Sequence, residues 1–144
     1  MSLRSRLVFF TLWLVLLIEL TQAQSDTVET SSGLKYYKIK STSGTPAKPG
    51  SKVKVAYIGR FTNGEVFQST EKDEYFIFKI GDPQIIKGWN EGFQLLRQGE
   101  KAVFIIPPWL AYGAKGAPDP TGEKQYIVPP NTTIIFEVEL LEIK

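Results

Sequence analysis

Hydrophobic and polar residues alternate along much of the chain, a pattern typical of half-buried β-strands. Alternating or short β-branched and aromatic runs occupy residues 34–39, 52–58, 75–80, 100–106 and 133–143. The pair Asn63-Gly64 lies between two further short runs and is a strong signal for a β-hairpin. The pattern therefore predicts about five antiparallel strands joined by short turns.

A single segment has the spacing of a helix. Ile86, Trp89, Phe93 and Leu96 recur at intervals of three and four residues, which places them on one face of roughly three turns. Gly99 would end this helix. The sequence thus predicts an α+β domain, with a twisted antiparallel β-sheet packed against one short α-helix.

The N-terminus has the features of a secretory signal peptide. Two arginines precede a mostly apolar segment, residues 7–20, and Thr21-Gln22-Ala23 places small residues before a cut after Ala23. An uncleaved membrane anchor is the alternative, but this segment is shorter than the roughly 20 residues that span a bilayer. We expect a signal peptide over residues 1–23, a flexible polar leader over 24–32 and a folded domain over 33–144. The protein would be secreted or periplasmic, or lie in the secretory-pathway lumen of a eukaryote.

Composition narrows the chemistry that this domain can perform. The chain has 144 residues, of which 42% are hydrophobic, as in a single globular domain. Its net charge of +2 gives no electrostatic footprint for nucleic acid. It contains no histidine and no cysteine, which excludes Ser-His-Asp and Cys-His catalysis and the usual zinc ligand sets.

Several segments together resemble a known family. Residues 81–92, GDPQIIKGWNEG, set two aliphatic side chains and a tryptophan beside glycines, as in the floor of an apolar pocket. With LAYGA at 110–114, IVPP at 127–130 and TIIFEVELL at 133–141, they resemble the second half of the FKBP family of macrolide-binding prolyl isomerases. The resemblance extends back to about Gly33. It implies a sheet of about five strands wrapped around the short helix, with no cofactor and no metal.

The resemblance also implies which residues form the site. Trp89 would be the floor beneath a proline ring, while the backbone N–H of Ile86 and the hydroxyl of Tyr112 would donate to ligand carbonyls. Because Gly88 and Gly92 flank Trp89, we expect open backbone around it. A core-packing role is the alternative for the aromatic residues, above all for Phe78. The expected catalytic residues are Tyr57, Phe67, Gln68, Ile86, Trp89, Tyr112 and Phe136, and the expected substrate-binding residues are Phe76, Phe78, Ile85, Ile127 and Val128.

The activity that the resemblance implies suits this composition. Rotation about an X-Pro peptide bond meets a barrier of roughly 18–20 kcal/mol, and the twisted transition state loses the polarity of the planar amide. An apolar pocket favours the twisted form without a nucleophile. The expected partners are proline-containing polypeptides and macrolides, and we expect a monomer.

Two departures from the family pattern qualify this expectation. Gln68 stands where the family usually has Asp directly after a pocket phenylalanine, which removes a charged hydrogen-bond acceptor. We therefore expect slow isomerisation and weakened macrolide binding. Residues 117–126 form an insertion, and we expect this loop to overhang the pocket and to select which protein chain enters.

Three functions stay open from the sequence. The first is a prolyl isomerase that accelerates the folding of exported proteins. The second is a binding module or chaperone of the same fold that holds proline-containing segments and catalyses little. The third is a domain that docks partners through its inserted loop.

Overall fold

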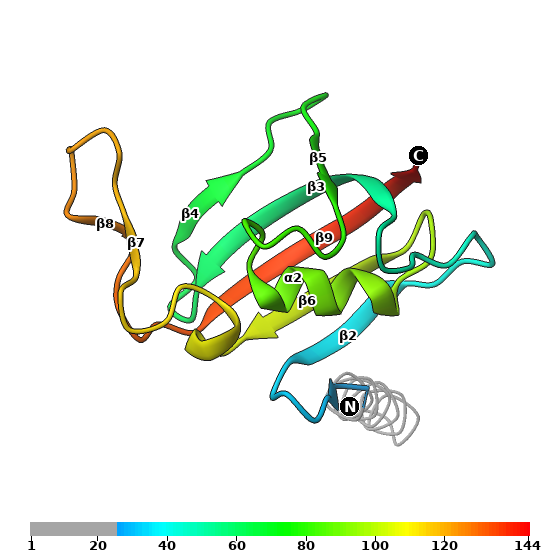
Figure 1. The fold of residues 1–144 in the computed structure, drawn as a ribbon, viewed down its shortest axis with the longest axis horizontal. Helices are drawn as coiled ribbons and strands as arrows, with labels where there is room; N and C mark the ends of the chain where they lie inside the picture. The colour runs from blue at the N-terminus through cyan, green and yellow to red at the C-terminus, as the bar shows by residue number, and fades with distance from the viewer. Residues whose placement is uncertain (1–25) are drawn as a thin grey trace, which may run out of the picture.

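A computed structural model describes residues 26–144 as an antiparallel sheet that curves around one short helix (Figure 1). The order of the main sheet is β1-β2-β6-β9-β3-β4. Strand β5 pairs with the same edge of β3 as β4 does, but nearer the start of β3. The predicted signal peptide lies outside the described residues. The strands of this sheet are β1 (Val28–Glu29), β2 (Lys35–Lys40), β3 (Lys52–Phe61), β4 (Val66–Ser69), β5 (Phe76–Lys79), β6 (Lys101–Ile106) and β9 (Ile134–Ile143).

The predicted α+β class is confirmed, although the helix is shorter than its pattern suggested. Helix α2 (Lys87–Gly92) continues as a 3-10 turn, η1 (Phe93–Leu95), so only part of the predicted segment is α-helical. Within residues 26–144 no helix is long and apolar enough to cross a membrane. The hairpin at Asn63-Gly64 is also confirmed, and Gly64 takes the positive φ of 90° that the turn requires.

The glycines around Trp89 have a different role from the expected one. A Cβ on Gly88 would lie 2.5 Å from Ile106 Cγ2, and a Cβ on Gly92 would lie 2.7 Å from Phe104 Cε2. Both glycines are buried. They let α2 approach β6 closely, and they do not leave open backbone around the tryptophan.

The end of the expected leader is part of the fold. Val28 pairs with Tyr36 in the β1–β2 ladder, and the backbone N–H of Thr30 donates to the carbonyl of Leu34 at 2.8 Å. Ser32 Oγ donates to Glu91 Oε2 on the helix at 2.5 Å. From Val28 onward, this segment is therefore held against the domain and is not a flexible leader.

One carboxylate is buried at the turn between η1 and β6. Glu100 is 1% exposed and accepts hydrogen bonds from the backbone N–H groups of Arg97 at 2.9 Å and Thr42 at 3.2 Å. Lys38 Nζ on β2 lies 2.9 Å from Glu100 Oε2, the oxygen that also accepts from Arg97. Burial alone would raise the pKa of Glu100, but the bonds from Lys38, Arg97 and Thr42 and the charge of Lys38 outweigh it and lower the pKa.

The inserted loop forms a second, two-stranded sheet. Strands β7 (Ala117–Pro118) and β8 (Tyr126–Val128) pair, and the hairpin projects from the end of the main sheet (Figure 1). Asp119 organises its tip, since its carboxylate accepts hydrogen bonds from the backbone N–H groups of Thr121 at 2.8 Å and Lys124 at 3.0 Å. The Thr121 hydroxyl also donates to this carboxylate, at 2.7 Å, and its bond does most to lower the pKa of Asp119, followed by the bond from the Thr121 backbone. The insertion thus has a defined conformation.

Candidate active site

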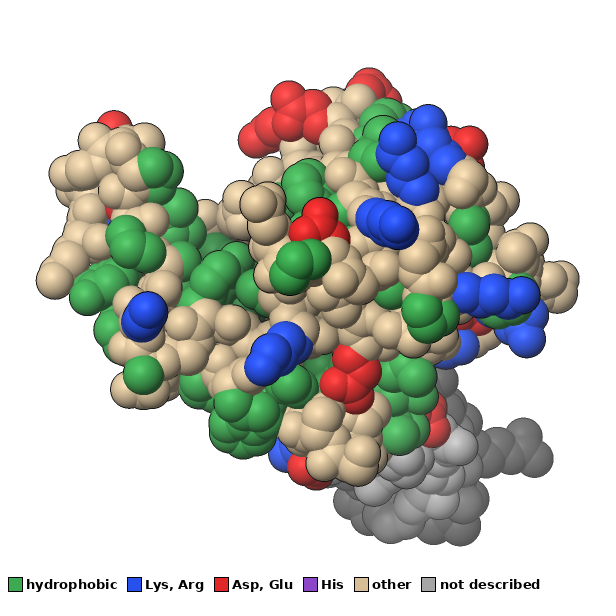
Figure 2. Space-filling model, in the orientation of Figure 1, with side chains coloured by type: hydrophobic (Ala, Val, Ile, Leu, Met, Phe, Trp, Pro, Cys, Tyr) green, Lys and Arg blue, Asp and Glu red, His purple; other side chains and the backbone are tan. Residues whose placement is uncertain are grey.

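A cavity of about 210 Å³ opens between the helix and the concave face of the sheet. Figure 2 shows hydrophobic side chains gathered in the recess between the β7–β8 hairpin and the body of the domain. The sheet supplies part of the lining, and the loop before α2 and the segment after β6 supply the rest. The lining residues are Tyr57, Gln68, Phe76, Gln84, Ile85, Ile86, Trp89, Tyr112 and Phe136.

The floor of the cavity rests on packed aromatic rings. Trp89, which is 5% exposed, lies edge-on to Tyr57 at 5.0 Å and to Phe136 at 5.1 Å between ring centroids. Phe78 and Phe93 contact it from the core at 5.6 and 5.3 Å. Edge-to-face pairs of this kind fix ring orientation. The indole N–H of Trp89 is buried and has no hydrogen-bond partner among residues 26–144.

The loop before α2 is held in place by Asn90. Its side-chain oxygen accepts from the backbone N–H of Gly81 at 2.7 Å, and its Nδ2 donates to the carbonyl of Asp82 at 2.9 Å. A longer bond from Nδ2 reaches the carbonyl of Ile85 at 3.4 Å. The backbone N–H of Ile86 has no acceptor within the described part of the chain. It is available to a ligand.

Tyr112 is positioned by the turn that follows β6. This segment begins with the 3-10 turn η2 (Pro108–Leu110), and the N–H of Gly113 donates to the carbonyl of Pro108 at 2.9 Å. The N–H of Asn131, in the loop before β9, donates to the carbonyl of Gly113 at 2.8 Å. The hydroxyl of Tyr112 makes no hydrogen bond to any residue in the described range and is a second available donor.

The cavity contains no group that titrates near neutral pH. Burial, and then the charge of Tyr112, raise the pKa of Tyr57 above its ordinary value of 10.0. Burial also raises the pKa of Tyr112 above 10.0. Both hydroxyls therefore remain protonated donors under physiological conditions, and the lining offers no acid–base pair.

We predict that any isomerase rate is flat with pH across the neutral range. Because the lining side chains that titrate are tyrosines with raised pKa values, kcat/KM should vary less than about twofold between about pH 6 and about pH 9. Exchange spectroscopy on an X-Pro peptide measures this directly. A bell-shaped profile centred near neutrality would contradict the proposed absence of acid–base catalysis.

Most of the predicted site residues meet at this cavity. The lining includes Tyr57, Gln68, Phe76, Ile85, Ile86, Trp89, Tyr112 and Phe136. Phe67 lies behind it, against Phe136 at 5.6 Å and Phe61 at 4.9 Å. Phe78 is 5% exposed and packs beneath Phe76, at 5.8 Å between centroids. The core-packing alternative thus describes Phe78.

The insertion does not reach the cavity as expected. Val128 is 1% exposed and belongs to the core, and Ile127 is half-buried and packs against that core. Neither residue lines the cavity, and none of residues 117–126 does so. The reason is the β7–β8 pairing, which carries the loop outward as a hairpin instead of folding it over the opening.

Two polar residues near the cavity were not predicted from the sequence. Gln84 lines it beside Ile85, and Asn90 fixes the loop that carries both aliphatic residues. Asn90 had a detectable signal, since it follows Ile86 by four residues and so lies on the same side of the predicted helix, where a polar side chain needs a hydrogen-bond partner. An amide there can bond to a preceding loop, but the sequence alone does not identify the partners.

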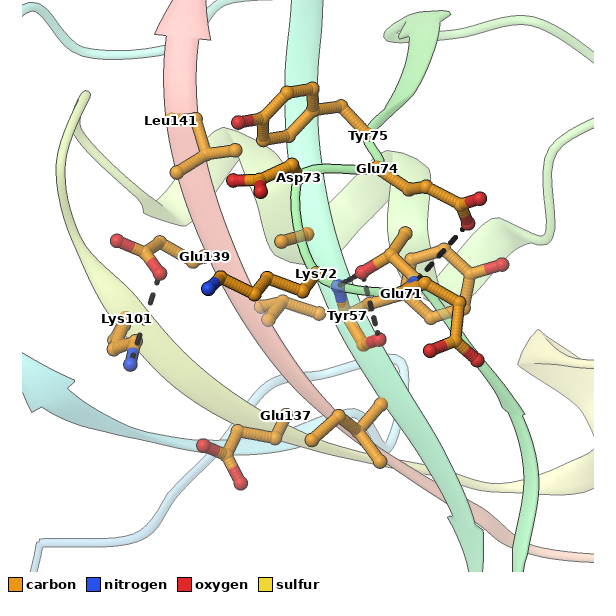
Figure 3. Close-up of a pocket in the computed structure, with 14 residues that line it drawn as sticks. Tyr57, Glu71, Lys72, Asp73, Glu74, Tyr75, Lys101, Glu137, Glu139 and Leu141 are labelled. Carbon is orange, nitrogen blue, oxygen red and sulfur yellow. Dashed lines mark hydrogen bonds and ion pairs between the residues drawn. The ribbon is translucent and has the colours of Figure 1, made fainter.

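A second hollow lies on the outer face of the sheet, away from α2 (Figure 3). The loop from Thr70 to Tyr75 forms one wall, and outward-facing residues of β3 and β9 form its base. Lys72 and Lys101 lie there among several carboxylates, including that of Glu139, which pairs with Lys101 at 3.8 Å. Because positive and negative side chains are mixed in its lining, this hollow favours neither an anionic nor a cationic ligand.

The concave sheet, the helix and the aromatic cavity with two available donors define a binding domain for a small apolar group attached to carbonyls. Residues 43–141 match the family model described as FKBP-type peptidyl-prolyl cis-trans isomerase. The chain belongs to this family.

Individual relatives agree with this assignment. FK506-binding protein 1 of Dictyostelium discoideum is 41% identical over 113 residues, which cover 78% of this chain and 99% of the relative. A probable FKBP-type peptidyl-prolyl cis-trans isomerase of Haemophilus influenzae is 41% identical over 119 residues, 82% of this chain and 46% of that protein. The crystal structure of AtFKBP13 superposes with a TM-score of 0.74 at 30% identity, covering 82% of this chain and 98% of that one.

Other curated relatives are much longer than this chain. It spans 32% of the FK506-binding protein 4 of Mycosarcoma maydis and 24% of that of Neurospora crassa. The first relatives that it matches thus contain the shared domain within larger proteins.

Proposed function

We propose that this protein is a peptidyl-prolyl cis-trans isomerase that accelerates X-Pro isomerisation during the folding of exported proteins. The observation that carries this proposal is the apolar cavity above Trp89, which has the available donors of Ile86 and Tyr112 at its edge. Family membership supports the same activity.

The proposed chemistry is non-covalent. A proline ring seated against Trp89 removes water from the prolyl amide, and water stabilises the planar, polar ground state more than the twisted transition state. The N–H of Ile86 and the hydroxyl of Tyr112 hold carbonyl groups on either side of the bond that rotates. Each such hydrogen bond contributes about 0.5–1.5 kcal/mol, and the orientation it imposes favours the twisted amide.

The site of action is a proposal that rests on the N-terminal sequence. A charged start, an apolar segment and small residues before Gln24 support export with cleavage after Ala23. N-terminal sequencing of the protein isolated from its own host tests it. Gln24 as the first residue agrees with export, whereas an intact N-terminus in the cytosolic fraction contradicts it.

The direct test of activity is cis-trans exchange of a short Leu-Pro or Phe-Pro peptide, followed by NMR without a coupled protease. We expect catalysed exchange that a macrolide ligand inhibits. Binding of the peptide without faster exchange would instead identify a low-activity binding module of the same fold. The observation favouring that second function is Gln68, which is neutral where the family pattern has a carboxylate.

Gln68→Asp is predicted to increase the rate. Gln68 lies on β4 opposite Gly59 and faces the cavity that Tyr57 also lines, and its amide makes no hydrogen bond to residues 26–144. A carboxylate there would offer the donors of the cavity a charged acceptor, whose hydrogen bond is about twice as strong as a neutral one. We expect kcat/KM and macrolide affinity to rise by about fivefold.

Gln68→Asn is the matched control, because it has the length of aspartate without the charge. It should leave both quantities within about twofold of the wild-type values, since its hydrogen bond stays neutral. An equal gain in both variants would assign the effect to side-chain length. No gain in either variant would contradict the role given to residue 68.

A further inference from the structure

We propose that a groove beside the cavity, walled by Trp109, is a second subsite that binds an apolar side chain flanking the proline of a polypeptide substrate. This inference rests on the proposed isomerase function and deepens it. The groove, here called the Trp109 groove, has a volume of about 390 Å³.

The Trp109 groove is continuous with the cavity. Both are lined by Gln84, Ile85, Ile86 and Tyr112. The groove lies on the far side of these residues and adds Pro83, Lys87, Pro108, Trp109, Ala111 and Gly113. A substrate carbonyl bonded to Ile86 or Tyr112 therefore lies at the boundary between the two sites, and the chain that continues from it passes into the groove.

Trp109 is both exposed and fixed. Its side chain is 64% exposed, although its indole N–H donates to the carbonyl of Ser32 at 2.8 Å. The ring also lies close over Gly33, where an added Cβ would be 2.9 Å from Trp109 Cζ2. A ring held in this way loses little conformational entropy when a ligand contacts it. The N-terminal segment thus presents a preorganised aromatic surface to the groove.

The lining determines which residue the groove favours. The lining combines apolar groups, among them the indole, two isoleucines and two prolines, with exposed polar atoms. An aromatic or branched aliphatic side chain would bury apolar surface against the apolar part of it. Lys87 is the charged residue of the lining and is exposed. An acidic residue beside the apolar one would therefore be preferred to a basic one.

The length of an extended peptide limits how far the favoured residue can lie from the proline. An extended chain advances about 3.3–3.6 Å per residue, so an adjacent groove accepts a side chain within about three residues of the proline. The Trp109 groove is thus predicted to make the enzyme selective for sequence beyond the X-Pro pair. This selectivity would concern one peptide position, on one side of the proline.

The test scans phenylalanine against alanine at each position flanking Leu-Pro in a short peptide, and measures exchange rates and dissociation constants by NMR. The readout is the Phe-to-Ala ratio of kcat/KM at each position. We expect a ratio of about three to ten at one position, the range expected for one aromatic contact. In Trp109→Ala the ratio should fall to near one, whereas Trp109→Phe should retain most of it.

Two further variants keep the test decisive if Trp109→Ala folds poorly. Lys87→Glu should reverse the preference for an aspartate over a lysine at the neighbouring peptide position. Tyr75→Ala removes another exposed aromatic ring, 48% exposed and on the outer face of the sheet, and should leave every ratio unchanged. Loss of the preference in Tyr75→Ala as well would overturn the assignment to the groove.

The outcomes also separate this inference from the proposed function. Catalysed exchange of all peptides with ratios near one in the wild-type protein would overturn the Trp109 groove and leave the isomerase intact. If no peptide exchanges faster, the isomerase proposal fails. The ratio of dissociation constants then decides whether the Trp109 groove selects side chains.

Discussion

Replacing Trp89 by leucine is expected to reduce kcat/KM for an X-Pro peptide by about ten- to a hundredfold, equivalent to about 1.4–2.8 kcal/mol of transition-state stabilisation. The leucine side chain cannot provide a flat floor, and its smaller volume admits water above the core. Water in the cavity restores the solvation of the planar amide and so removes the differential effect. Exchange spectroscopy on the folded variant measures this loss.

Phe93→Leu is the matched control for this variant. Phe93 is fully buried and contacts Trp89 at 5.3 Å, but it does not line the cavity. Both substitutions remove a core aromatic and should lower the free energy of unfolding by about 1–4 kcal/mol. Only Trp89→Leu should lose activity out of proportion to stability. Equal activity losses would show that the floor acts through core packing alone.

Glu100→Ala is expected to lower the free energy of unfolding by about 1–3 kcal/mol, because two partly buried backbone N–H groups lose their acceptor. These are the N–H groups of Thr42 and Arg97. The variant also leaves Lys38 without its carboxylate partner, although Lys38 is 32% exposed and can be solvated. Denaturant titration near neutral pH measures the change.

The lowered pKa of Glu100 also predicts that the stability of the protein depends on pH. The pKa of Glu100 is lowered in the folded state, so its contribution is fully present above the unfolded value near 4.5 and is lost as the pH falls below it. The stability of Glu100→Gln should therefore fall less steeply than that of the wild-type protein in this acidic range. Parallel slopes for the two proteins would contradict the lowered pKa.

Glu139→Ala is the control for the buried network. Glu139 also pairs with a lysine, Lys101, but the contact is longer at 3.8 Å and its side chain is 31% exposed. We expect a loss of less than about 1 kcal/mol, as for other ion pairs near the surface. A similar loss for Glu139→Ala and Glu100→Ala would mean that burial of Glu100 adds nothing.

The pattern of the sequence predicted the main sheet because its strands are half-buried. Residues 133–143 alternate, and β9 accordingly buries Phe136 and Val138 while Glu137 faces outward. The helix was predicted too long because its periodic side chains continue through η1, which shares the same buried face. Hydrophobic spacing does not distinguish an α-helix from a 3-10 turn that extends it.

The position of the site was predictable, but its edges were not. Trp89, Tyr57 and Tyr112 line one cavity as the family resemblance implied, because members of a family share a fold that brings matching positions together. The insertion has no such guide, and its hairpin pairing depends on backbone bonds that composition does not reveal. Trp109 likewise has no signal in the sequence, because its orientation depends on a hydrogen bond to Ser32, far away along the chain.

The contrast between the two tryptophans of residues 26–144 provides a spectroscopic tool. Trp89 is 5% exposed with an unbonded indole N–H, and Trp109 is 64% exposed with a bonded one. The first should emit at shorter wavelength and resist quenching by iodide, while the second should emit at longer wavelength and be quenched readily. In protein that begins at Gln24 and so lacks Trp13, fluorescence can therefore report occupancy of the cavity and of its neighbouring groove as two separate signals from one unlabelled sample.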